Sequence, residues 1–176
     1  VLIPKSDGGL RPIGLLPTLY RIWMRCRRPT IKKWRAQNAK AYRFGGAGKG
    51  AQRAAWLHAA RAEVAKGGGS CYASVLLDLV QAFETISHKH IVAAAKKHNY
   101  NLWILRLSLR SYRVPRTIVV DSVCSTPVVA SQGITAGSGF ATEELACLLI
   151  DVCDDLLKQY PTLDLTEYVD DLTLCQ

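Results

Sequence analysis

The sequence lacks the features that define several common classes of protein. No stretch approaches the roughly 20 apolar residues needed to cross a bilayer, no signal peptide is visible, and no membrane partner is expected. The six cysteines include no Cys-x-x-Cys pair, which disfavours a zinc site and a disulfide framework. Cysteines in mostly apolar surroundings indicate an intracellular, reducing compartment, either nuclear or cytoplasmic.

Acidic residues are scarce at the start of the chain. Residues 1–66 hold fifteen Lys or Arg against only Asp7 and Glu63, whereas residues 67–176 hold eight bases and twelve acids. A basic region of this density is typical of a protein that binds the phosphate backbone of a nucleic acid. The alternative is a solvated basic face that keeps the protein soluble.

Turn residues and hydrophobic periodicity predict an α+β fold with one continuous core and no internal repeat. A hairpin is expected around Ser6 to Gly9, and a basic helix over 16–34 is expected to break at Pro29. A helix over 51–66 should place Ala54, Leu57 and Val64 on its apolar side.

The rest of the chain alternates strands and helices. A strand is expected over 72–78, and a hairpin at the end of the chain. A β pair is expected between 117–120 and 127–130, with 121–125 as the connection. Helices are expected over 87–97, with Ser87 as N-cap, over 102–111, and over 141–159, where Val152 belongs to the apolar stripe. This order favours helices packed on one face of an antiparallel sheet.

Two carboxylates stand side by side in the last hairpin, in the sequence Tyr168-Val169-Asp170-Asp171, and they are expected to form its turn. Adjacent like charges raise each other's proton affinity, so the arrangement is unfavourable unless a cation relieves it. Mg²⁺ prefers hard oxygen ligands and is commonly held by one or two carboxylates. Asp78 ends a strand far upstream, and a third carboxylate beside the hairpin would complete a two-metal phosphoryl-transfer site.

Four stretches in this order resemble the reverse transcriptases, most closely those of non-LTR retrotransposons and next those of group II introns. They are Ile3 to Ile13, Asp78 to His88 (DLVQAFETISH), Gln132 to Ser138 (QGITAGS) and Tyr168 to Asp171 (YVDD). The resemblance implies an RNA-directed DNA polymerase with a right-hand fold. Residues 1–70 would be part of the fingers and residues 71–176 part of the palm, whose antiparallel sheet carries helices on one face.

The resemblance also implies the roles of individual residues. Asp78, Asp170 and Asp171 would be the catalytic carboxylates and would hold two Mg²⁺ ions, with Mn²⁺ as the alternative. The implied partners are an RNA template, a DNA primer and dNTPs. The residues implied to contact the incoming nucleotide are Lys5, Arg11, Phe83, Gln132 and Gly133, of which Phe83 would exclude the ribose 2′-hydroxyl.

The pattern is not matched everywhere, and other functions stay open. Glu84, Gln81 and Ile134 to Ala136 depart from the residues usual in the family. The thumb is absent, so the chain is expected to be a fragment that is inactive by itself. The alternatives are an inactive, nucleic-acid-binding remnant of a retroelement and an RNA-templated RNA polymerase. The Gly-rich stretch 45–50 lacks the spacing of a phosphate-binding loop.

Overall fold

The computed structural model describes residues 2–4, 6, 8–46, 48–120 and 123–176. The chain divides into two compact units, each built from two segments. The first unit comprises Val1–Trp34 and Gln81–Cys147, and the second comprises Arg35–Val80 and Leu148–Gln176. Each unit contains segments of both expected domains, 1–70 and 71–176, so the division into fingers and palm stays a prediction. No helix in the described ranges is long and apolar enough to span a bilayer.

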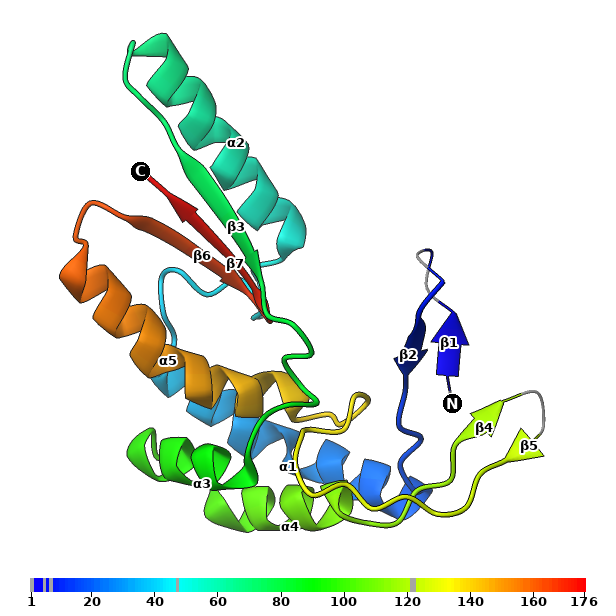
Figure 1. Ribbon diagram of the computed structural model, residues 1–176. Coiled ribbons are helices and arrows are strands. Elements are labelled where there is room, and N and C mark those ends of the chain that lie inside the picture. The colour runs from blue at the N-terminus through cyan, green and yellow to red at the C-terminus, as the bar shows by residue number, and fades with distance from the viewer. Residues whose placement is uncertain (1, 5, 7, 47, 121–122) are drawn as a thin grey trace. The chain divides into compact units, whose positions relative to one another are not determined.

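The first unit begins with the hairpin that the sequence predicts. Strands β1 (Leu2–Pro4) and β2 (Leu10–Pro12) pair antiparallel (Figure 1). Helix α1 (Thr18–Gln37) follows and contains Pro29, so the prediction of a break at this proline is wrong. Pro29 is exposed. The buried side chains of the helix, Met24, Ile31 and Trp34, lie before and after it. Burial of these apolar side chains outweighs the backbone hydrogen bond that proline removes.

Helices α3 (His88–Lys97) and α4 (Leu102–Tyr112) pack against each other in the first unit. Ser87 occupies the N-cap position of α3 as expected, but its side chain makes no capping hydrogen bond. Asn101 caps α4, because its Oδ1 accepts hydrogen bonds from the backbone N–H groups of Trp103 and Ile104, both at 3.1 Å. The start of α4 is therefore fixed by its own sequence.

The expected β pair between 117–120 and 127–130 is confirmed only in part. Strand β4 (Val119–Val120) lies within the first segment, but it pairs with β5 (Val123–Cys124). The second segment meets the first only through an isolated antiparallel bridge between Arg116 and Val128. The predicted connection over 121–125 thus contains β5, and Asp121 and Ser122 within it lie outside the described residues. Short runs of valine on both sides left the register ambiguous in the sequence.

A buried carboxyl group lies in the core of the first unit. Glu144, in helix α5 (Ala141–Gln159), is fully buried, and its Oε2 accepts a hydrogen bond of 2.6 Å from the Tyr112 hydroxyl. Burial raises the pKa of Glu144 to about 7, although this hydrogen bond acts in the opposite direction. Between pH 4.5 and about 7, the folded chain therefore holds a proton on Glu144 that the unfolded chain releases.

We predict that this proton makes stability depend on pH. Because the folded pKa of about 7 exceeds the ordinary value of 4.5, the contribution of Glu144 to stability is fully present below pH 4.5 and is lost as pH rises through about 7. The contribution of this group is roughly 3 kcal/mol by linkage. Urea unfolding from pH 4.5 to 8 should show this decline in the parent and a flatter profile in Glu144→Gln, which keeps the shape and the Tyr112 contact. An equal decline in both proteins would contradict the prediction.

The second unit is built on a three-stranded antiparallel sheet in the order β3-β7-β6. Its strands are β3 (Ser74–Asp78), β6 (Asp164–Tyr168) and β7 (Asp171–Cys175). On the edge of β6 that does not face β7, Glu167 forms an isolated parallel bridge with Arg43. The Arg43 Nε donates to Glu167 Oε1 at 3.0 Å, and both side chains are almost completely buried. This pair anchors the strand that leads into the YVDD hairpin.

Helices flank both faces of this sheet, whereas the sequence predicted one face only. Helix α2 (Ala51–Gly67) lies beside the sheet in Figure 1, and its Arg61 forms an ion pair with Asp164 of β6. Glu167 points to the opposite face, where Cys153 of α5 lies near it. Two residues expected in apolar stripes are instead exposed, Val64 of α2 at 76% and Val152 of α5 at 61%.

Candidate active site

The three predicted carboxylates converge at one end of the sheet in the second unit. Asp78, the last residue of β3, is the direct cross-strand partner of Asp171, the first residue of β7. Direct partners in an antiparallel pair project from the same face with their Cβ atoms roughly 5 Å apart. Tyr168 of β6 is the partner of Asp171 on its other side, so the three side chains form one row across the sheet.

The turn between β6 and β7 carries the third carboxylate. It consists of Val169 and Asp170, with Val169 at a φ of 62°. A β-branched residue rarely adopts a positive φ, and such a conformation costs roughly 1–3 kcal/mol. The sequence suggested a turn made of the two aspartates, but the turn lies one residue earlier and Asp171 belongs to the strand. The strained tight turn holds Asp170 next to the row formed by Asp78 and Asp171.

The carboxylates of Asp78 and Asp170 both affect the pKa of Asp171. Partial burial, the Asp170 carboxylate and the Asp78 carboxylate, in that order, raise the pKa of Asp171. Among the described residues, no three His, Cys, Asp or Glu side chains are gathered tightly enough to hold a metal ion as they stand. The donor set itself fits Mg²⁺, because it consists of hard carboxylate oxygens whose mutual repulsion a cation would relieve.

A cavity of about 630 Å³ lies between this end of the sheet and α2. Asp78, Tyr168 and Asp171 line it from the sheet, and Thr166 lies one row deeper on the same face. From α2, the cavity is lined by four alanines and His58, whose Nδ1 is buried without a hydrogen-bond partner among the described residues. The small side chains of α2 leave space in front of the carboxylates.

The lining from α2 was not predicted as part of the site. The signal was present, since Ala51, Ala54, Ala55 and Ala59 recur at the spacing of one helix face. Of these four, only Ala54 was predicted to take a particular place, on the apolar side of the helix. His58 lies on the same face, but a single histidine in an alanine-rich helix is not distinctive in a sequence.

Three of the five predicted nucleotide-contacting residues come together in the first unit. The backbone N–H of Gly133 donates to Ile86 O at 2.8 Å, and that of Ile134 donates to Phe83 O at 2.6 Å. Gly133 has a φ of 88°, and a Cβ there would lie 2.7 Å from Glu84 O. Only glycine allows this approach of two backbone segments. The Phe83 side chain is half-buried and Gln132, next to Gly133, is exposed.

The remaining two predicted residues are described less fully. Lys5 lies outside the described residues, and Arg11 is described only by its backbone, in β2. The segment after β2 contacts the segment 132–138, because the Gly14 N–H donates to Ala136 O at 2.8 Å. Gly137 has a φ of 104°, and a Cβ there would lie 2.7 Å from Gly14 O. The strand of Arg11 therefore continues into contact with the segment that begins at Gln132.

Comparisons with known proteins identify the fold. No protein-family model matches the sequence, and no curated protein matches it either. Among solved structures, the chain is similar to the apo telomerase of Candida tropicalis truncated from its C-terminal domain. The TM-score is 0.59 and the sequence identity is 12%. The match covers 100% of this chain and 43% of the telomerase chain. It is also similar to the telomerase of Candida albicans in complex with the TWJ fragment of telomeric RNA, with a TM-score of 0.56, 11% identity, and coverage of 100% and 37%.

These similarities define a class of fold. The chain has an α+β, reverse-transcriptase-like fold of the kind found in telomerase. It spans about two-fifths of the length of the two telomerases. At 11–12% identity, the likeness concerns the fold alone.

We predict that a divalent cation stabilises the second unit through the carboxylates. The raised pKa of Asp171 means that its ionised form disfavours the folded state at neutral pH, so Asp171→Asn should be at least as stable as the parent without Mg²⁺. Mg²⁺ at tenfold its Kd should stabilise the parent by about 1.4 kcal/mol, or about 3–6 °C in Tm.

Thermal unfolding with and without Mg²⁺ measures both effects. Asp171→Asn should lose most of the Mg²⁺-dependent rise in Tm, and Glu63→Gln, which removes an exposed acid of α2, should keep it. An identical rise in all three proteins would show that the cation binds elsewhere.

Proposed function

We propose that the chain is the fingers and most of the palm of an RNA-directed DNA polymerase that joins dNTPs to a primer 3′-hydroxyl. The observation that carries this proposal is the cross-strand pairing of Asp78 with Asp171, beside a turn that holds Asp170. Carboxylates separated by some ninety positions in the sequence share one end of one sheet. The reverse-transcriptase-like fold and the four ordered motifs support the same function.

In this proposal the protein itself supplies positioning and charge. Asp78, Asp170 and Asp171 hold the metal ions, and the Arg43–Glu167 pair fixes the strand that leads into the turn. Two Mg²⁺ ions, or Mn²⁺, would lower the pKa of the primer 3′-hydroxyl and neutralise charge on the departing pyrophosphate. Such a reaction needs no protein nucleophile, which is consistent with a site built from carboxylates.

The nucleotide-contacting residues take their roles from the same proposal. Arg11 and Lys5 would bind the triphosphate, for which a guanidinium offers two parallel donors and an ammonium a compact charge. Gln132 and Gly133 would lie against the templating base and the incoming nucleotide. The tight backbone contact of Gly133 supports a rigid segment there.

The template is proposed to be RNA and the primer DNA. Of the neighbouring structures, one is described as a complex with telomeric RNA. The sequence motifs favour a retrotransposon enzyme of the non-LTR type over a group II intron enzyme. An intracellular, reducing location, nuclear or cytoplasmic, is proposed from the cysteines, which include no Cys-x-x-Cys pair.

The first test removes one carboxylate. In a polypeptide that also contains the expected thumb, Asp170→Asn should reduce primer extension on an RNA template at least about a hundredfold, because one ligand of the metal site is lost. Binding of the template–primer duplex should remain near that of the parent. Glu63→Gln is the matched control and should extend normally. Extension by Asp170→Asn near the parent rate would refute the proposal.

A second candidate function is an inactive nucleic-acid-binding remnant. It is favoured by the lack of a ready-made cluster of three metal-binding side chains among the described residues. A remnant would bind nucleic acid with a steep salt dependence and show no Mg²⁺-dependent incorporation once the thumb is present. The intact triad counts against it, because repelling acids have no use in a surface that only binds phosphates.

The identity of the sugar provides a further prediction. The parent should incorporate dNTPs in preference to rNTPs, because Phe83 would collide with the 2′-hydroxyl. In Phe83→Ala this preference should narrow roughly tenfold to a hundredfold. Phe83→Tyr, which keeps the ring, is the control, and the Tm of each variant excludes misfolding. A parent that prefers rNTPs would instead favour an RNA-templated RNA polymerase.

A further inference from the structure

A groove between α1 and α4 in the first unit combines exposed arginines with tryptophan. Its volume is about 530 Å³. The lining includes Arg27 and Trp23 of α1 and Trp103, Arg106 and Arg110 of α4, and it contains no acidic residue. We call this surface the Trp103 groove. None of its residues belongs to the carboxylate site or to the predicted nucleotide-contacting set.

Trp103 is held in an exposed position by local interactions. It is 78% exposed, although it is the largest apolar side chain of α4. Its backbone N–H is bound by the Asn101 cap, which fixes the first turn of the helix. The Arg106 guanidinium lies 6.0 Å from the centre of its ring, one helical turn further on. One face of the indole is therefore supported by a cation, and the other face is available to a planar ligand.

The charge around the groove is almost entirely positive. The described residues of the first unit hold fourteen Lys and Arg against three Glu, of which Glu143 and Glu144 are buried. Within the described ranges, no acidic side chain forms an ion pair with Arg27, Arg106 or Arg110. All three arginines are exposed and present unneutralised guanidinium groups to solvent, which suits a polyanion.

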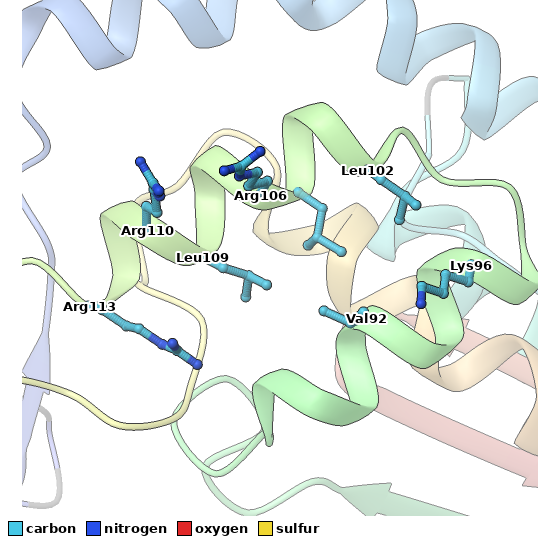
Figure 2. Close-up of a pocket in the computed structure, with 8 residues that line it drawn as sticks. Val92, Lys96, Leu102, Arg106, Leu109, Arg110 and Arg113 are labelled. Carbon is cyan, nitrogen blue, oxygen red and sulfur yellow. The ribbon is translucent and has the colours of Figure 1, made fainter.

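The positive surface continues on the other side of α4. Figure 2 shows a second groove, between α3 and α4, with Val92 and Leu109 toward its centre and Lys96 and Arg113 at its edge. Its volume is about 310 Å³, and Arg106 and Arg110 line both grooves. The two arginines are four residues apart on one helix and therefore form a ridge with cationic groups on either side.

We propose that the Trp103 groove binds single-stranded RNA. A base stacks on the open face of Trp103, and Arg27, Arg106 and Arg110 contact the flanking phosphates. Stacking requires an unpaired base, which selects single strands over duplexes. Thr30 and the Asn101 amide line the same groove and can hydrogen-bond a ribose 2′-hydroxyl, which selects RNA. This surface acts in addition to template–primer binding at the proposed active site.

The test measures binding of a fluorescein-labelled, unstructured 12-nucleotide RNA by anisotropy, in EDTA, so that no step depends on the metal site. Trp103→Ala should weaken binding at least about fivefold, because base–aromatic stacking is worth roughly 1–3 kcal/mol. Trp56→Ala, which removes a tryptophan of α2 that is 67% exposed, is the matched control and should change binding less than twofold.

The phosphate contacts are tested by salt dependence. Arg106→Gln/Arg110→Gln should reduce the slope of log K against log salt by about 1.4, the value for two phosphate contacts to a single strand. Lys89→Gln/Lys158→Gln removes two exposed charges outside both grooves and should leave the slope nearly unchanged. Circular dichroism of every variant confirms that it is folded.

Several outcomes would overturn the inference. If Trp103→Ala and Trp56→Ala lose RNA affinity equally, binding depends on the general charge of the protein. The same conclusion follows if the two double variants show equal slopes of log K against log salt. Double-stranded RNA or the matching DNA strand binding as tightly as single-stranded RNA would remove the stated selectivity. Competition by a poly-glutamate peptide or by anionic vesicles at equal charge would show a surface for another polyanion.

Discussion

The pairing of β3 with β7 places repelling charges next to each other, and the proposed chemistry depends on that register. Asp78 and Asp171 face each other directly, whereas a slip of one residue would move every side chain of β3 to the other face of the sheet. The partners further along the two strands are mainly aliphatic and hydroxyl side chains, including Val75 with Leu174 and Leu76 with Thr173. Their pairing sets the register that brings the two carboxylates together. The unfavourable contact is therefore imposed by the rest of the sheet.

The same end of the sheet concentrates other unfavourable features. Val169 adopts a positive φ, and β6 carries the buried Glu167, whose pKa burial raises despite the neighbouring Arg43. Strain and buried charge cluster where the surrounding structure holds them in place. Here the support comes from the pairing of β7 with β3 on one side and with β6 on the other. The Arg43–Glu167 pair adds to it at β6, the strand that leads into the turn. Such a site suits a ligand that relieves repulsion on binding.

Much of the fold could be predicted from the sequence, because its strongest signals are local. The hairpin after Pro4, the helix over Ala141–Gln159 and the strand that ends at Asp78 follow from turn residues and periodicity. Pro29 and the valines of β4 and β5 were misjudged for a different reason. In these cases tertiary burial and strand pairing decided between local options of similar energy. The convergence of Asp78 with the YVDD turn was inferred from motifs, since no local property of either segment encodes the pairing.

The two units differ in the charge that they present to solvent. The described part of the first unit is strongly basic, and its only exposed acid is Glu84, whereas the second unit presents Asp78, Asp170 and Asp171 together. A polyanion is attracted to the first surface and repelled by the second unless cations are present. A nucleic acid near the carboxylates thus requires metal ions, while one on α4 does not. This difference in cation requirement is the physical property by which the two proposed nucleic-acid surfaces can be told apart.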